Sequence, residues 1–247
     1  MSHDASIGSN VEIGPYSIVD GNVVVGENCW IGNHVTLKHG TRIGTRCKIF
    51  HGAVIGEIPQ DVKFKGEETV VEIGDEVIIR ELVTVNRGSK LRAKTEIRDR
   101  AYLMAYVHVA HDCFVGENAI FVNNVQLGGH VLVDDWVMIG GRVNVHQFCR
   151  IGKHAFIAGG YRVVQDVPPY VLVGGEPLKF YGLNSVGLRR QGFSQEIRKD
   201  IKRAYQLIYR SSLNTSQAIE EIKKTLSQSE EIQEIISFVE SSERGLT

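Results

Sequence analysis

The chain has 247 residues, 43% of them hydrophobic, and a formal net charge of −1 at pH 7. This length and composition allow one sizeable core with a smaller appendage, and the balanced charge argues against a nucleic-acid-binding protein. No apolar run is long enough to span a bilayer, and the N-terminus has neither the basic nor the apolar region of a signal peptide. We therefore expect a cytoplasmic protein without a membrane span.

A period of six residues extends, with two interruptions, from Ile7 to Val163. An aliphatic or aromatic residue opens each unit, and a small or β-branched residue follows four positions later. One such unit cannot bury its own apolar face, so successive units must stack as short parallel strands, three to a coil. The repeat predicts a mainly β fold, a parallel β-helix with the first position of each unit in its interior. The small fifth position fits a crowded inward site.

Glycine often occupies the second position of the unit, as at Gly14 and Gly116. We interpret this position as a corner that needs a positive φ angle. Small residues at the fifth position include every cysteine of the chain, and no CxxC spacing occurs, so we expect buried thiols rather than disulfides or metal ligands. The four are Cys29, Cys47, Cys113 and Cys149.

Two segments break the repeat, near residues 59–70 and 87–94. Long loops inside a regular repeat commonly carry function or are simply solvated. The first holds Asp61 and Lys63, side chains suited to a polar or phosphorylated ligand, and the second is basic. Composition alone does not choose between a ligand contact and a solvated insertion for either segment.

One group of polar residues stands out from the repeat. Residues one coil apart lie above one another, so the segment His108–Asp112 meets the corresponding positions of the next two coils. The patch near a corner of the coil then comprises His111, Asp112, Gly129, His130, His146 and Gln147.

Three interpretations of this patch stay open from the residues alone. Histidines in a repeat are most often surface hydrogen-bonding groups. Several neutral imidazoles together also suit zinc, as in the hexapeptide-repeat γ-class carbonic anhydrases. In the third interpretation His111 is a general base that activates a hydroxyl for attack on a thioester, and the Gly129 N–H stabilises the oxyanion. Asp112 would orient or stabilise the imidazolium.

The segments MAYVHVAHDCFVGENAIFVNN (104–124), LGGHVLVDDWVMIGG (127–141), VHQFCRIGKHAFIAGG (145–160) and GLRRQGF (187–193) resemble the UDP-N-acetylglucosamine acyltransferases. That family opens lipid A synthesis in Gram-negative bacteria, and the resemblance covers nearly the whole chain. It implies a left-handed β-helix, whereas parallel crossovers in general are right-handed. It also implies a homotrimer with clefts between subunits, acyl carrier protein as donor, and neither metal nor cofactor.

By the same resemblance, His111 is the general base, the Gly129 N–H is the oxyanion donor, and Gly159 stands where acyl-chain length is set. Residues that match the family's substrate contacts are Asp61, Lys63, His108, His130, His146, Gln147, Asn184 and Arg190.

Three positions depart from the family pattern. Val186 stands where a glutamate is common, Gln191 where a second arginine is common, and Pro177 where a histidine is common. These departures bear on how the nucleotide is held, and they leave the surroundings of His111 intact.

Beyond Val163 the hexads end, and we place a domain boundary between a β-helix over 1–183 and a helical domain over 184–247. Apolar residues then recur at helical spacing in three stretches. Ser194 is the expected N-cap of the first helix, and Thr215 or Ser216 precedes the second. The third has apolar residues from Ile232 to Val239.

Basic residues gather before Ser211, and acidic residues dominate after it. A basic helix face is most simply a solvated one, but an acyl carrier protein is acidic, and complementary charge would speed its docking. The cluster comprises Lys179, Arg189, Arg190, Arg198, Lys199, Lys202, Arg203 and Arg210.

The predicted function is transfer of an acyl group, expected to be 3-hydroxylated, from acyl carrier protein to the 3-position of UDP-N-acetylglucosamine. Three alternatives stay open: acylation of a 3-amino UDP-sugar, a metal-dependent hydratase of the γ-carbonic anhydrase type, and a catalytically silent scaffold.

Overall fold

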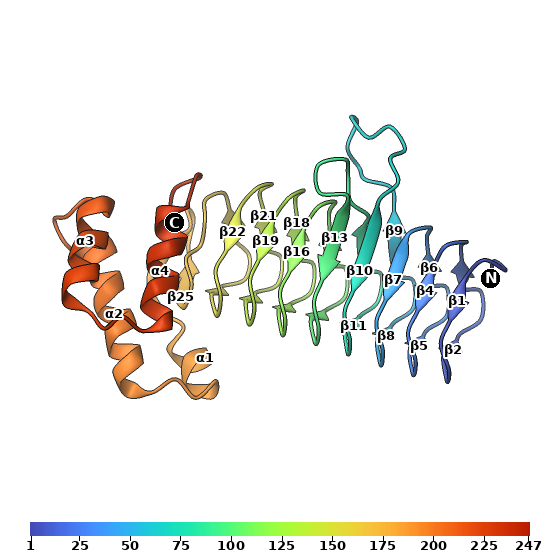
Figure 1. Cartoon of the computed structure of the whole chain (residues 1–247), viewed down its shortest axis with the longest axis horizontal. Helices are drawn as coiled ribbons and strands as arrows, with labels where there is room; N and C mark the ends of the chain where they lie inside the picture. Colours follow the sequence, from blue (N-terminus) through green and yellow to red (C-terminus); the bar gives the residue numbers. More distant parts are fainter.

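The computed structural model describes residues 1–247, which form a long β-helix followed by four helices (Figure 1). Most strands have only two residues, and residues of successive coils pair in parallel, as in the column Val109, Leu127, Val145 and Val163. The stacking that the repeat predicts is therefore confirmed. Three sheets form the faces of the prism.

The first sheet contains β1 (Ser6–Ile7), β4 (Val24–Val25), β7 (Thr41–Ile43), β10 (Val70–Ile73), β13 (Lys94–Ile97), β16 (Phe114–Val115), β19 (Leu132–Val133) and β22 (Arg150–Ile151). The second contains β2 (Glu12–Ile13), β5 (Trp30–Ile31), β8 (Lys48–Ile49), β11 (Ile78–Ile79), β14 (Tyr102–Leu103), β17 (Ile120–Phe121), β20 (Met138–Ile139), β23 (Phe156–Ile157), β25 (Val171–Gly174) and β26 (Lys179–Leu183). The third contains β3 (Ile18–Val19), β6 (Thr36–Leu37), β9 (Val54–Glu57), β12 (Thr84–Asn86), β15 (His108–Val109), β18 (Gln126–Leu127), β21 (Asn144–Val145) and β24 (Arg162–Val163).

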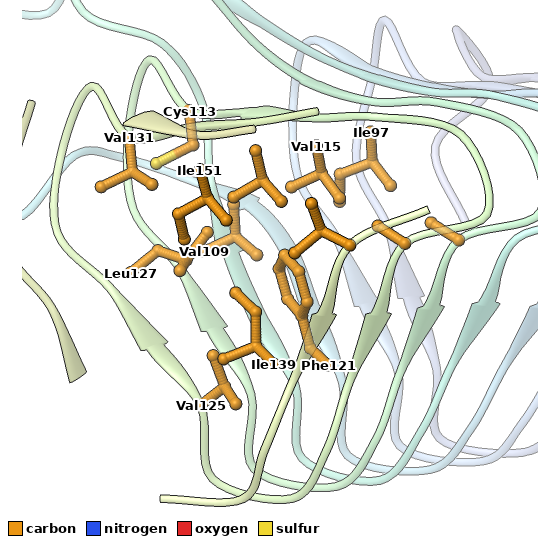
Figure 2. Packing of buried hydrophobic residues seen from close by; sticks show 14 of the residues in the cluster. Ile97, Val109, Cys113, Val115, Phe121, Val125, Leu127, Val131, Ile139 and Ile151 are labelled. Carbon is orange, nitrogen blue, oxygen red and sulfur yellow. The ribbon is translucent and has the colours of Figure 1, made fainter. Parts of the chain in front are cut away.

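The chain turns a corner between each pair of sheets, and we name the corners 1/2, 2/3 and 3/1 after the sheets they join. Side chains of the first and fifth positions fill the prism, as Figure 2 shows for Ile97, Val109, Phe121 and Ile139. All four cysteines are free and buried, as predicted. Burial raises the pKa of Cys113 to about 12, so this thiol stays protonated.

The interpretation of the second-position glycines was wrong. Positive φ occurs at the fourth position of the unit, as at Asn28 (φ 59°) and Asp112 (φ 60°). Glycine is needed at the second position because neighbouring coils approach closely there. A Cβ on Gly26 would lie 2.5 Å from the Gly44 carbonyl oxygen, and one on Gly116 would lie 2.5 Å from a backbone carbon of the next coil.

Both predicted interruptions are loops that leave the prism at corner 3/1. Residues 58–69 join β9 to β10, and residues 87–93 join β12 to β13. In Figure 1 the two loops rise from the same edge of the prism. Both therefore lie at the corner that also holds His111, which is one coil beyond the loop 87–93 and two coils beyond the loop 58–69.

The parallel β-helix is closed by β25, which pairs with β23 and then antiparallel with β26. The helices are α1 (Ser185–Arg190), α2 (Gln195–Arg210), α3 (Thr215–Thr225) and α4 (Glu230–Glu240). The three predicted helices are present. The short α1 was missed because six residues that bury only Leu188 give no periodic signal.

The predicted N-cap Ser194 accepts a hydrogen bond from Ile197 N, whereas the second helix is capped by Asn214 rather than by Thr215 or Ser216. Asn214 and Gln217 form a reciprocal capping box. The helices pack on the end of the prism, where the Tyr205 hydroxyl donates to the Pro169 carbonyl at 2.6 Å. None of the helices combines the length and apolarity needed to cross a membrane.

Candidate active site

A histidine and a carboxylate form a hydrogen-bonded pair at corner 3/1. His111 Nδ1 lies 2.7 Å from Asp112 Oδ2, and the Asp112 side chain is fully buried while that of His111 is 14% exposed. An ionised carboxylate can only accept, so the His111 proton sits on Nδ1 and the lone pair is left on Nε2. This is the tautomer that a general base needs. Sequence adjacency alone did not establish the contact, because adjacent side chains commonly point apart.

The loop 87–93 holds the carboxylate in its ionised form. Asp112 Oδ1 accepts from Ser89 N at 3.0 Å and from Arg92 N at 3.2 Å. Burial raises the pKa of Asp112, but the hydrogen bonds from Ser89 and His111 outweigh that effect and lower the pKa overall. The basic loop 87–93 therefore binds the Asp112 carboxylate through its backbone, a role that its composition did not reveal.

Gly129 lies directly above the imidazole. A Cβ at this position would stand 2.7 Å from His111 Nε2, so only glycine leaves the ring in place. The Gly129 N–H donates to no protein acceptor. At the equivalent positions Asp75 and Glu117 the N–H is accepted by an aspartate of the next coil. An N–H that no protein group accepts, next to a histidine–carboxylate pair, is suited to stabilising an oxyanion.

His130 completes the cluster from the next coil. Its Nε2 lies 3.7 Å from Asp112 Oδ2, its ring meets the His111 ring edge to face, and it stacks on Phe148 at 4.5 Å. Burial lowers the pKa of His130, although the Asp112 and Asp61 charges act in the opposite direction. His130 is therefore neutral at neutral pH.

The other predicted contacts at this corner surround the cluster. His108 Nδ1 lies 2.7 Å from Thr84 Oγ1, and burial lowers the His108 pKa. His146 Nδ1 lies 3.0 Å from the Gln147 carbonyl oxygen on the far side of Gly129. The structure thus brings His108, His146 and Gln147 to corner 3/1.

In loop 58–69, Asp61 and Lys63 lie in a tight turn. Asp61 Oδ1 accepts from Lys63 N at 2.9 Å. The turn fixes the carboxylate, and the Lys63 ammonium stays without an ion pair inside the chain. Both residues therefore keep ionic groups available beside corner 3/1.

His111, Asp112 and His130 are also the one group of potential metal ligands in the structure. Binding a metal between His111 Nδ1 and Asp112 Oδ2 would break the hydrogen bond that joins them. The set contains two histidines and one carboxylate, and it lacks the three histidines that the zinc interpretation required. The donor atoms are better matched to a base and its orienting group.

Asn184 and Arg190 lie elsewhere, on a groove of about 700 Å³ that runs over the second sheet and corner 1/2. Asn184 Oδ1 caps helix α1 through Gly187 N, and its Nδ2 donates to the His154 carbonyl at 3.0 Å. The floor of the groove is apolar and was not foreseen. It includes Ile78, Ile120, Trp136, Met138 and Phe156.

Two departures from the family pattern, Val186 and Gln191, line the same groove, so they face the same space as Arg190. Gly159 lies at corner 2/3, where a Cβ would meet the Gly141 carbonyl oxygen at 3.0 Å. Within one chain the predicted site residues therefore fall on three different corners of the prism.

A left-handed parallel β-helix of hexapeptide repeats, with a hydrogen-bonded histidine–carboxylate pair at one corner, fits the class of hexapeptide-repeat acyltransferases. The model for bacterial transferase hexapeptide (six repeats) matches residues 4–39 and 22–57, and that for Udp N-acetylglucosamine O-acyltransferase, Domain 2, matches residues 166–247. The chain is 43% identical to the acyl-[acyl-carrier-protein]–UDP-N-acetylglucosamine O-acyltransferase of Thiobacillus denitrificans, over 98% of this chain and 94% of that protein. The corresponding protein of Halorhodospira halophila is 46% identical over the same shares.

The crystal structure of a UDP-N-acetylglucosamine acyltransferase from Bacteroides fragilis superposes with a TM-score of 0.99 at 46% identity, over 100% of this chain and 97% of that one. The Acinetobacter baumannii structure gives 0.97 at 41% identity, over 100% and 96%. The chain belongs to the acyl-[acyl-carrier-protein]–UDP-N-acetylglucosamine O-acyltransferase family. The left-handed fold with a C-terminal helical region, expected from the resemblance, is confirmed.

Proposed function

We propose that this protein transfers a 3-hydroxyacyl group from acyl carrier protein to the 3-hydroxyl of UDP-N-acetylglucosamine, the opening reaction of lipid A synthesis. The observation that carries the proposal is the His111–Asp112 pair beneath the free Gly129 N–H, in a chain of this family. Four free cysteines are consistent with the reducing cytoplasm, where we place the reaction.

In the proposed reaction, His111 Nε2 accepts the proton of the sugar hydroxyl while the oxygen attacks the thioester carbon. The Gly129 N–H stabilises the tetrahedral oxyanion. When the C–S bond breaks, the proton passes from His111 to the leaving thiolate, and the new C–O bond completes the ester. Asp112 stabilises the imidazolium between these steps.

We propose that Asn184 and Arg190 hold the nucleotide, and that they do so for the active site of a neighbouring copy. Both lie at corner 1/2, away from the His111 corner of their own chain. A C₃ homotrimer, with head-to-tail contacts that close into a ring, would bring the two corners together. The apolar outer face of the second sheet is suited to such a contact. Asp61, Lys63, His108, His130, His146 and Gln147 would then contact the sugar and the thioester.

Helix α2 is the proposed docking surface for acyl carrier protein. Lys199, Lys202, Arg203 and Arg210 are all exposed on it. An acidic carrier would be attracted to this surface, and the association rate would fall as salt screens the charges. We also keep the domain boundary proposed at 183/184, where strand β26 gives way to helix α1.

A donor panel of acyl carrier protein thioesters of different chain lengths, each with UDP-N-acetylglucosamine and with its 3-amino analogue, tests the reaction. We expect ester formation with the hydroxyl sugar. Exclusive turnover of the amino sugar would reassign the acceptor, and no turnover of either would reject the proposal. Activity that survives a strong chelator would separate acyl transfer from the metal-dependent alternative.

Mixing two variants of low activity tests whether one site is formed by His111 of one copy and Arg190 of its neighbour. His111→Ala removes the base, and Arg190→Ala weakens the nucleotide contact. Co-refolded at equal amounts and assayed at low acceptor concentration, they should regain about a quarter of wild-type activity, because one interface in four pairs an intact His111 with an intact Arg190. No recovery would mean that both residues serve the same chain.

A further inference from the structure

The last residues of the chain return to corner 3/1. After α4 the tail pairs with the end of the β-helix: Asp166 N donates to the Gly245 carbonyl, Thr247 N donates to the Asp166 carbonyl, and Ser242 Oγ donates to Asp166 Oδ2 at 2.8 Å. Asp166 is only 1% exposed. In Figure 1 the C-terminus lies beside the last coils. The tail is therefore fixed by a buried carboxylate and by backbone pairing.

The hydrogen bonds between the tail and Asp166 place Arg244 at corner 3/1. Its Nη2 lies 3.2 Å from both the Val164 carbonyl oxygen and His146 Nδ1, and its Nε lies 3.4 Å from the same carbonyl. Nη1 has no protein acceptor. Arg244 forms no ion pair, so a fixed cation with free donors faces the corner.

The contact also affects His146. A guanidinium can only donate, so its hydrogen bond requires an unprotonated Nδ1 and puts the His146 proton on Nε2. The alternative contact, Nδ1 to the Gln147 carbonyl oxygen at 3.0 Å, needs the opposite tautomer. The permanent positive charge beside the ring favours the first arrangement. With the His146 proton on Nε2, that N–H can donate a hydrogen bond beside the free N–H groups of Arg244.

The height of Arg244 above the base suggests what it binds. The column His111, Gly129, Gln147, Gln165 rises three coil steps, about 14 Å at the usual strand spacing, and Gly245 lies against Gln165. The phosphopantetheine arm of a carrier protein has about as many backbone bonds between phosphorus and sulfur as four to five residues, a reach of about 15 Å. A thioester at His111 would therefore place its phosphate near Arg244.

We propose that Arg244 is a donor-binding residue that holds the phosphodiester of the phosphopantetheine arm, and that His146 assists it. The inference rests on the proposed function. Arginine suits this task because its planar fork matches a phosphate and stays charged at every working pH. The acceptor also carries phosphates, but those are assigned above to Asn184 and Arg190 of the neighbouring copy.

The test varies the charge of the protein and the phosphate of the donor together. Wild type, Arg244→Ala, Arg244→Lys and the neighbouring control Glu243→Ala are assayed with acyl carrier protein thioester, acyl-phosphopantetheine and acyl-pantetheine, which lacks the phosphate. Arg244→Ala should raise KM about tenfold for the two phosphorylated donors and leave acyl-pantetheine unchanged. Arg244→Lys should restore part of the loss, and Glu243→Ala should behave as wild type.

An equal loss with acyl-pantetheine would overturn the proposal, since a merely structural role weakens every donor alike. A rise confined to the KM for UDP-N-acetylglucosamine would overturn it too, because the cation would then serve the acceptor. If the wild-type protein turned over none of the three donors, the proposed function itself would be rejected. As a control for folding, the thermal unfolding midpoint of Arg244→Ala is compared with that of the wild type. Equal midpoints show that the tail is still packed against the β-helix.

Discussion

Corners 3/1 and 1/2 are built from the same repeat, and they carry the same kind of stack at the fourth position of the unit. At corner 3/1, His130 stacks on Phe148, and at corner 1/2, His154 stacks between Trp136 and Tyr170. Burial lowers the pKa of both histidines, to about 4 for His154. The backbone and the aromatic stacking are alike at the two corners.

The difference lies in what interrupts the repeat. At corner 3/1 the loop 87–93 leaves the prism and holds the buried Asp112 carboxylate against His111. At corner 1/2 helix α1 packs instead, and Phe193 covers His154 edge to face at 5.0 Å without any carboxylate on its ring. The regular scaffold thus supplies equivalent positions, and the segments that leave the repeat decide which histidine is paired with a carboxylate and which is covered by an aromatic ring.

Replacing the base should have the largest effect. His111→Ala should lower kcat about 10³-fold, because no other group at corner 3/1 can take the hydroxyl proton at the same point. The measurement is steady-state acyl transfer alongside the unfolding midpoint, which should not change. Lys153→Ala, next to His154 at corner 1/2, is the control. A residual kcat within tenfold of wild type would contradict the assignment.

Asp112→Asn should lower kcat about 10²-fold. An asparagine can keep the hydrogen bonds from Ser89 and Arg92, but its charge no longer stabilises the imidazolium. The KM for either substrate should change little, because Asp112 is buried. If kcat stayed the same while only stability fell, Asp112 would be a structural residue of the loop.

A methyl group on Gly129 should also lower the rate of acyl transfer. The Cβ of Gly129→Ala would stand 2.7 Å from the His111 ring, so the imidazole must move away from its place beside the Gly129 N–H. We expect kcat to fall about 10²-fold. Gly21→Ala is the matched control, at the same repeat position and corner, with its nearest neighbour at 3.4 Å. Equal effects of the two substitutions would refute the oxyanion role.

At corner 1/2 the effect should appear in binding rather than in the chemical step. Arg190→Ala should raise the KM for UDP-N-acetylglucosamine about tenfold and leave kcat nearly unchanged, because a lost charged hydrogen bond weakens binding by roughly that factor. Isothermal titration with UDP alone should show the same loss. A fall in kcat with unchanged KM would place Arg190 in the chemistry.

The smallest expected effect is on stability. The pKa of His154 is about 4 when folded and 6.5 ordinarily, so the unfolded chain binds the additional proton between these values. The contribution of neutral His154 to the free energy of unfolding should therefore be complete above pH 6.5 and decrease as the pH falls toward 4. His154→Phe should lessen this slope, since Phe148 already adopts the same positive φ at the equivalent position. An unchanged slope in chemical denaturation would reject the explanation.

The sequence determined the repeat architecture, because a single inward aliphatic per hexad permits no other way of burying it. It also located both loops to within a residue at each end. It brought His111, Asp112 and Gly129 together, because residues one coil apart in the sequence stack on one another. The resemblance, rather than the residues, supplied the left hand of the coil and the assignments on the helical region.

Only the tertiary structure decided the remaining features. It showed that the second-position glycines serve close contact between coils rather than positive φ, and that Ser89 and Arg92 hold Asp112. It placed Asn184 at a different corner from His111, and it brought Arg244 back to corner 3/1. The glycine contacts arise between coils of the repeat itself, whereas the other three features depend on segments that leave the repeat. Local periodicity does not predict where such a segment packs. That outcome is decided by long-range hydrogen bonds such as those of Asp112 and Asp166.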